Sequence, residues 1–270
     1  MRRVSPISRL KSGLVAAAGG LGLLFLVVPV IVLISRAIGT PVVDELAAIA
    51  QAILLSFVTT LLTALLTLTF GTPLAFVLAR WRFPLRRTLN MLIELPIVLP
   101  PAVAGLALLV TFGRRGALGE ALTLIGVSLP FTTAAVVVAQ TFVSAPFYIR
   151  SAQVGFQGVP REIEDAARVD GAEGLVLFRF VTLPLARRAL AAGLVLSWAR
   201  ALGEFGATIL FAGSLQGRTQ TMPLLIYSVF ERDIDAAIWA GAILIGMALI
   251  ALMLSQRLRR EDLPTADGYT

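Results

Sequence analysis

Residues 46–79 form a run of 34 residues without a single charged side chain. A helix needs about 20 apolar residues to cross the hydrocarbon core of a bilayer, so this run is long enough to span a membrane. The composition of the whole chain also indicates a membrane protein, because charged residues make up only 14% of the 270 residues. Soluble proteins average about 25%. A soluble globule and a disordered tail protein are both excluded.

Charged loops divide the apolar sequence into six predicted spans. These spans cover residues 14–38, 52–79, 89–112, 130–149, 189–212 and 236–256. The first is longer than the core of a signal peptide, about 7–15 residues, and we interpret it as an uncleaved span. Pro96, Pro100 and Pro101 interrupt the third span and predict a break in it.

The net charge of +7 follows the predicted topology. Of the 23 basic residues, 17 fall on segments that share one side of the membrane with both termini. Since cytoplasmic loops are enriched in Arg and Lys, both termini are predicted to be cytoplasmic, and no nucleic-acid partner is needed to explain the charge. The predicted domains are a cytoplasmic N-terminus at 1–13, a membrane domain at 14–256 with a polar loop at 150–188, and a cytoplasmic tail at 257–270.

Two missing residue types narrow the function. The chain has no Cys and no His, which excludes thiolate metal sites and every catalytic triad that needs an imidazole. Lys11, the single lysine, follows Leu10 and cannot complete the Gly-Lys-Ser/Thr step of a phosphate-binding loop. We expect no metal, no bound cofactor and no enzymatic activity, although a carboxylate mechanism stays open. Energy must then come from a gradient or from another subunit.

The polar loop at 150–188 contains 11 charged residues and a predicted capped helix. Pro160 suits a first helical position, and Glu162 and Glu164 lie in the first turns, where the helix dipole favours acids. Gly171 fits a left-handed C-terminal cap. A second short helix at 172–180 is expected to stop at Pro184. Such a projection suits a groove on a soluble partner; an ordinary amphipathic loop helix is the alternative.

This segment resembles the coupling loop of ABC importer permeases. That family carries Glu-Ala-Ala, three residues, Gly, nine residues and Ile-x-Leu-Pro before its second-last span. Here Asp165-Ala166-Ala167, Gly171 and Val181-Thr182-Leu183-Pro184 match in order and spacing, with Asp for Glu and Val for Ile. The resemblance implies docking into a groove on an ATPase subunit. The coupling residues that it implies are Glu164, Asp165, Ala166, Ala167, Arg168, Gly171, Leu183 and Pro184.

Arg200 and Glu204 lie four residues apart in the fifth span, on one helical face. A buried arginine costs at least about 2.5–3.5 kcal/mol, so both should face the bundle interior or a water-filled path. They either form a structural salt bridge or leave Arg200 to pass an anion. Gly203 and Gly206 would allow close helix approach. The candidates for the path or its gate are Arg200, Glu204, Gly203, Thr208 and Pro100.

Residues 199–208 resemble the branch of ABC permeases for molybdate, tungstate and sulfate, and residues 217–227, 99–105 and 112–119 resemble the molybdate permeases. The similarity covers roughly residues 50–257. It implies an all-α, type I importer permease, a multi-pass protein of a prokaryotic inner membrane. The implied partners are a second copy, two ATPase subunits that carry ATP and Mg, an external oxyanion-binding protein, and lipid.

Residue chemistry alone does not identify molybdate as the substrate, because tetrahedral oxyanions differ little in shape. The resemblance favours molybdate as the substrate, with tungstate as a second candidate. A sulfate or thiosulfate permease is the alternative in the same branch. A gradient-driven transporter or channel is the alternative from another class.

Overall fold

The structure is a computed structural model that describes residues 6–39 and 46–260, and within these ranges it contains helices and no strand. Residues 1–5 of the predicted N-terminus (1–13) and residues 261–270 of the predicted tail (257–270) lie outside the described residues. The helices are α1 (Pro6–Gly39), α2 (Leu46–Arg80), α3 (Arg86–Val98), α4 (Pro101–Phe112), α5 (Gly119–Leu124), α6 (Thr133–Gln157), α7 (Arg161–Val169), α8 (Gly174–Leu177), the π-helical turn η1 (Phe178–Thr182), α9 (Leu183–Leu202), α10 (Gly206–Ala212), α11 (Met222–Phe230) and α12 (Ile234–Arg260).

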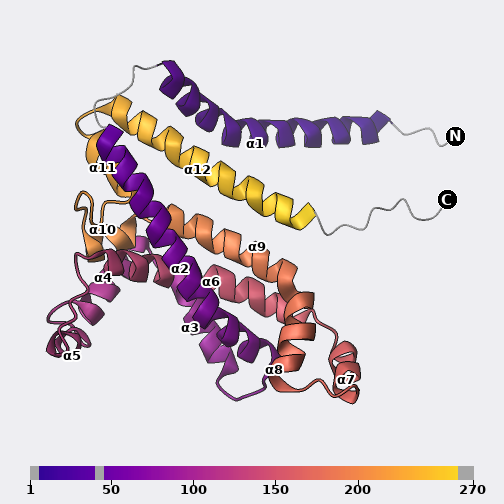
Figure 1. The fold of residues 1–270 in the computed structure, drawn as a ribbon. Helices are drawn as coiled ribbons and strands as arrows, with labels where there is room; N and C mark the ends of the chain where they lie inside the picture. Colours follow the sequence, from indigo (N-terminus) through magenta and orange to yellow (C-terminus); the bar gives the residue numbers. More distant parts are fainter. Residues whose placement is uncertain (1–5, 40–45, 261–270) are drawn as a thin grey trace.

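Helices α2, α6 and α9 form the centre of the bundle (Figure 1). Glycines let α6 and α9 approach closely: a Cβ on Gly155 would lie 2.5 Å from the Cβ of Ala189, and one on Gly193 would lie 2.5 Å from that of Ser151. At this distance hydroxyls reach the neighbouring backbone, and Ser151 Oγ donates to the carbonyl of Ala189 at 2.8 Å. Small residues and interhelical hydrogen bonds hold helices together where no water drives their association.

The buried face of α2 is rich in hydroxyl groups. Ser56, Thr60, Thr63 and Thr67 recur at helical spacing, and each is at most 1% exposed. Thr60 Oγ1 donates to the carbonyl of Ser56 at 2.7 Å, and Thr63 Oγ1 donates to Gln140 Oε1 of α6 at 3.2 Å. The uncharged run at 46–79 therefore has a polar inner face and an apolar outer face.

The number of spans is not confirmed at six. Within the described residues, three helical stretches are long and apolar enough to cross a membrane: Val15–Gly39, Leu46–Arg80 and Gly174–Leu202. Helices α3 and α4 meet at an angle of 115° and count as a fourth span if the pair crosses together. This bend confirms the break predicted from the prolines. The side of the membrane on which the termini lie stays a prediction.

Three helices differ from the elements predicted from sequence. Helix α6 continues to Gln157, beyond the predicted end of the fourth span at residue 149. Pro184 does not stop a helix: α8, η1 and α9 form one helical stretch, because the wider π-turn lets Leu183 N–H bond to the carbonyl of Phe178, and Pro184 falls in the first turn of α9. The fifth predicted span is instead interrupted after Leu202 and resumes at Gly206.

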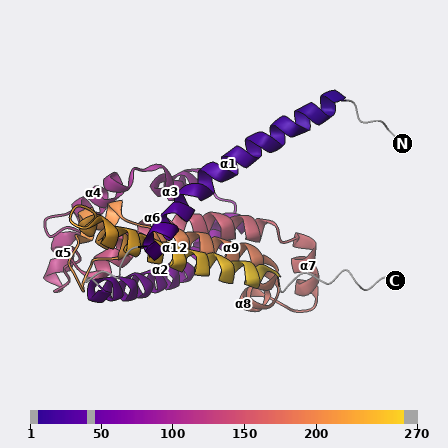
Figure 2. The same ribbon diagram turned by 90° about the horizontal axis from the view of Figure 1, so that it is seen from above.

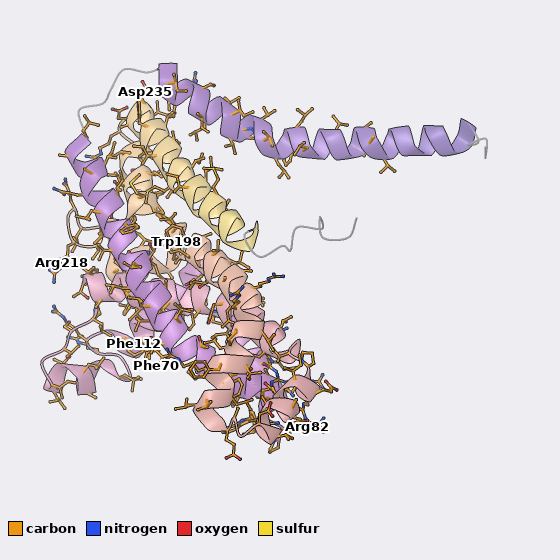
Figure 3. The ribbon with its side chains drawn as sticks, turned by 45° about the vertical axis from the view of Figure 1, so that its right-hand side comes forward. Phe70, Arg82, Phe112, Trp198, Arg218 and Asp235 are labelled. Carbon is orange, nitrogen blue, oxygen red and sulfur yellow. The ribbon has the colours of Figure 1, made fainter. Side chains whose placement is uncertain are left out.

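The molecule has two distinct ends. Helices α7 and α8 lie at one end of the bundle and α5 at the other in both views (Figures 1 and 2). Arg82 lies at the α7 end, whereas Arg218 and Asp235 lie toward the opposite end (Figure 3). This separation matches the predicted alternation of inner and outer segments. Helix α1 packs against α12 and leaves most apolar side chains of Val15–Gly39 exposed, although Ala37 is buried.

Candidate functional site

The projection at the lower end of the bundle is built from α7 and α8. Helix α7 ends in a Schellman motif: Ala172 N–H donates to the carbonyl of Ala167 at 2.9 Å, and Gly171 N–H donates to that of Arg168 at 3.0 Å. Gly171 has φ +89°, a conformation that side-chain-bearing residues rarely adopt. The predicted left-handed cap is confirmed, and the chain turns sharply here because residue 171 is glycine.

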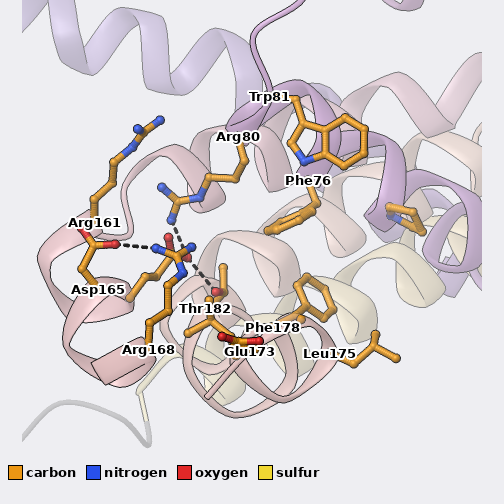
Figure 4. A pocket seen from close by; sticks show the side chains of 14 residues that line it. Phe76, Arg80, Trp81, Arg161, Asp165, Arg168, Glu173, Leu175, Phe178 and Thr182 are labelled. Atoms are coloured by element: carbon orange, nitrogen blue, oxygen red, sulfur yellow. Dashed lines mark hydrogen bonds and ion pairs between the residues drawn. The ribbon is translucent and has the colours of Figure 1, made fainter. Parts of the chain in front are cut away.

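The two adjacent acids of α7 have opposite environments. Asp165 is exposed and pairs with Arg168 on the same helix. Glu164 is 5% exposed, and its Oε1 accepts hydrogen bonds from Arg80 Nη2 at 2.9 Å and from Thr182 Oγ1 at 2.7 Å. Figure 4 labels the two donors, Arg80 and Thr182, and marks these hydrogen bonds with dashed lines. Asp165 can therefore meet a partner, whereas Glu164 contacts its own chain.

Arg80 fixes the start of the projection as well. Its Nη2 also donates to the carbonyl of Val159 at 3.1 Å, just before α7 begins. Arg80 and Thr182 are not among the residues predicted from sequence. Arg80 belongs to a basic segment that indicates topology, and Thr182 occupies the variable position of the Ile-x-Leu-Pro motif. The spacing of residues along the chain gives no sign that they meet Glu164.

A pocket of about 930 Å³ lies between the end of α2, α7 and α8 (Figure 4). Phe76, Trp81 and Phe178 form its apolar wall, and Arg161 and Arg168 of α7 contribute its charged wall. Of the other predicted coupling residues, Ala166 is exposed, Ala167 is half-buried, Leu183 is half-buried and Pro184 is exposed. The structure brings Glu164 close to the start of α9 and leaves Asp165, Ala166 and Arg168 exposed.

A second group of predicted residues surrounds the break between α9 and α10. Arg200 Nη1 lies 2.6 Å from Glu204 Oε2, and the Arg200 and Glu204 side chains are 29% and 1% exposed. The other carboxylate oxygen of Glu204 accepts a hydrogen bond from Ala207 N–H at 2.8 Å in the first turn of α10. The predicted pair exists, but it bridges a break instead of lying along one continuous helix. The buried carboxylate of Glu204 therefore both pairs with Arg200 and caps the first turn of α10.

The remaining path candidates are not gathered into one site. Thr208 is buried, and its hydroxyl has no hydrogen-bond partner among the described residues. Pro100 is exposed and precedes α4 at the other break. Gly203 is exposed, and a Cβ there would meet nothing nearer than a backbone oxygen of its own helix at 3.8 Å, so within the described residues it makes no close approach to another helix.

Close approach at the breaks depends on Gly206 and Gly105. A Cβ on Gly206 would lie 2.5 Å from the Cβ of Pro101, and one on Gly105 would lie 2.8 Å from the carbonyl oxygen of Ala207. Helices α4 and α10, which both follow a break, cross at these contacts. The sequence predicted the Gly206 contact. It did not predict that Gly105 lies opposite.

Long apolar helices, a capped projection at one end and two broken helices crossing one another define a membrane transport subunit. A family model described as "Binding-protein-dependent transport system inner membrane component" matches residues 71–260. The chain belongs to this family of transport permeases. Its membership places the chain among inner-membrane transport components.

Curated relatives cover most of the chain. A probable transport system permease NifC of Clostridium pasteurianum is 36% identical over 96% of this chain and 92% of its own length. The molybdenum transport permease ModB of Mycobacterium tuberculosis is 45% identical over 75% of this chain and 76% of its own. A probable sulfate transport permease cysT of Chlorokybus atmophyticus is 34% identical over 84% of this chain and 82% of its own.

Solved structures share the fold. A chain of a bacterial ABC transporter for the import of alginate superposes with a TM-score of 0.75, covering 94% of this chain and 96% of its own at 18% identity. Identity this low shows the fold alone. The type I importer fold expected from the sequence is confirmed.

Proposed function

We propose that the chain is the membrane-spanning subunit of an ATP-driven importer for molybdate, with tungstate as a second substrate. The observation that carries the proposal is the capped projection at α7, whose exposed face and Gly171 turn suit docking into a groove on an ATPase subunit. The similarity to a molybdenum transport permease over 75% of the chain supports the choice of substrate. A sulfate permease is the second candidate, favoured by the 34% identity to cysT.

The working complex contains two copies of this chain, two ATPase subunits and an external oxyanion-binding protein. ATP and Mg bind to the ATPase subunits, since this chain has no phosphate-binding loop. Asp165, Ala166, Ala167 and Arg168 form the docking face; Gly171 sets its turn. Leu183 and Pro184 begin α9, the helix that transmits movement of the projection to the membrane domain. Lipid covers the exposed apolar residues of α1.

Arg200 is the residue that receives the anion in the path. It is the only basic residue of the predicted spans away from their ends, and it keeps 29% of its side chain exposed although its partner Glu204 is buried. A dianion beside Arg200 competes with Glu204 for the guanidinium, and such charge-assisted contacts are stronger than neutral ones. Gly203, Thr208 and Pro100 lie at or near the two helix breaks and make up the rest of the gate region.

The test is uptake by the full complex in proteoliposomes, with loaded binding protein outside and ATP inside. We expect radioactive molybdate to enter only with ATP, and unlabelled tungstate to compete better than sulfate. Dissipating ion gradients should have no effect, and an ATPase subunit without its catalytic residue should abolish uptake. Uptake that persists without ATP would favour a gradient-driven transporter, and stronger competition by sulfate would favour a sulfate permease.

A further inference from the structure

We infer that Glu164 is a positioning residue that ties the projecting helix α7 to the ends of α2 and α9, so that movement of α7 is transmitted to both membrane helices. The inference rests on the proposed docking of α7 to an ATPase subunit. Docking alone does not explain how a movement of α7 is transmitted to the membrane helices, and the inference concerns this step. The carboxylate that makes this connection belongs to Glu164, the buried neighbour of Asp165, which matches the acid of the family motif.

Burial within α7 is confined to one residue. Glu164 is the only buried residue of this helix, whereas Ile163 is 44% exposed and Val169 is 87% exposed. A surface helix is usually held by an apolar stripe, but α7 has little apolar surface against the bundle. Its attachment beyond its two connecting turns therefore depends on what Glu164 binds.

Glu164 joins three parts of the chain at one oxygen atom. Its Oε1 accepts from Arg80, the last residue of α2, and from Thr182, the residue before α9. Arg80 also holds the carbonyl of Val159 ahead of α7. The side chains of Arg80 and Glu164 are 11% and 7% exposed, so water does not compete freely for these contacts. Charge-assisted hydrogen bonds in such surroundings are directional and strong.

The two helices that receive the contact reach far into the bundle. Helix α2 is continuous over 35 residues, and α9 runs 20 residues from Leu183 toward the Arg200–Glu204 break. Both pack against α6, so they form one body. A displacement of α7 that keeps the Glu164 contacts intact must move the lower ends of both helices. The same displacement without these contacts can be absorbed by the turns at Gly158 and Gly171.

The first test uses the purified full complex in proteoliposomes and measures the molybdate transported per ATP hydrolysed. Glu164→Gln should retain the ATPase subunit but lower this ratio by about fivefold or more. Thr182→Val, which removes only the link to α9, should lower it in the same direction. Glu162→Gln is the matched control, because Glu162 is an exposed acid of the same turn, and it should leave the ratio unchanged. A normal ratio in both Glu164→Gln and Thr182→Val overturns the inference.

The change Arg80→Gln distinguishes loss of the Arg80–Glu164 contact from a general loss of stability. Combined with Glu164→Gln, it should lower the transport ratio by less than the sum of the two single losses, since both changes remove the Arg80–Glu164 contact. Arg80→Lys keeps the charge and should restore part of the ratio. Additive losses in the double variant would mean that the two residues act separately, and the inference would be wrong.

The second test needs no transported substrate. Because the chain has no cysteine, spin labels can be attached to single cysteines at Asp170 beside α7 and Leu196 on α9, both exposed. The distance between these labels should stay constant when ATP is added to the wild-type complex and should broaden in Glu164→Gln. An unchanged narrow distribution in Glu164→Gln overturns the inference. Absence of ATP-driven uptake by the wild-type complex would instead contradict the proposed function alone.

Discussion

The guanidinium of Arg200 lies 2.6 Å from the carboxylate of Glu204 across the break between α9 and α10. Glu204 is almost fully buried, and its second oxygen caps the first turn of α10 through Ala207 N–H. A salt bridge and an anion path are therefore not exclusive alternatives here. The pair connects α9 to the first turn of α10, and the 29% of the Arg200 side chain that stays exposed is what the proposed contact with an anion requires.

Arg200→Gln should slow oxyanion uptake about tenfold while the complex stays assembled, because a permanent positive charge leaves the path. The same change leaves the Glu204 charge buried and unpaired, which costs about 3–5 kcal/mol and should lower the melting temperature. The double change Arg200→Gln with Glu204→Gln should recover the melting temperature but not the uptake. Uptake that recovers together with stability would return Arg200 to a structural role.

Gly171→Val should separate ATP hydrolysis from transport. Residue 171 has φ +89°, and a left-handed conformation costs a residue with a side chain about 1–2 kcal/mol, so α7 should lose its Schellman turn. Molybdate uptake and ATP hydrolysis are measured together in proteoliposomes. Gly158→Ala is the control, since Gly158 ends α6 with an ordinary φ of −75° and should remain coupled. Full coupling in Gly171→Val would contradict the proposed role of the turn.

Cysteines at Ala166 or Ala167 should form cross-links to a co-expressed ATPase subunit. Ala166 is exposed and Ala167 is half-buried, both close to exposed Asp165, and the cysteine-free chain gives no background. A cysteine at Leu124, 89% exposed on α5 at the opposite end of the bundle, should give none. The products are identified by mass after oxidation. If an intact complex yields no α7 cross-link, α7 is not the docking element.

Gly206→Ala should destabilise the crossing of α4 and α10. The added Cβ would lie 2.5 Å from the Cβ of Pro101, and overpacking of this kind costs about 1–3 kcal/mol. Gly203→Ala is the matched control three residues away, where the nearest atom outside the adjacent residues is at 3.8 Å, and it should be close to neutral. Thermal unfolding in detergent compares the two. Equal stability of both variants would mean that α4 and α10 do not cross this tightly.

Local chemistry made several features predictable from sequence. The prolines at 96, 100 and 101 deny the helix its regular hydrogen bonds, and the 115° bend follows from them. Gly171 at the end of an acid-first helix predicts a left-handed cap, and the structure has it. Each of these inferences needs only neighbouring residues. The same locality explains the error at Pro184, where a π-turn in the preceding residues removes the expected stop.

The sequence by itself determined that the chain is a membrane protein with a polar, glycine-capped helix between its apolar segments and with a break at its proline cluster. Only the tertiary structure decided that Glu164, and not its neighbour Asp165, is buried, and that its partners are Arg80 and Thr182. Arg80 and Glu164 are 84 residues apart, and their contact exists because α2 ends where α7 begins to project. Composition and spacing determine which faces a segment can offer. Helix packing determines which side chains meet, and the cost of burying a charge then requires that they pair.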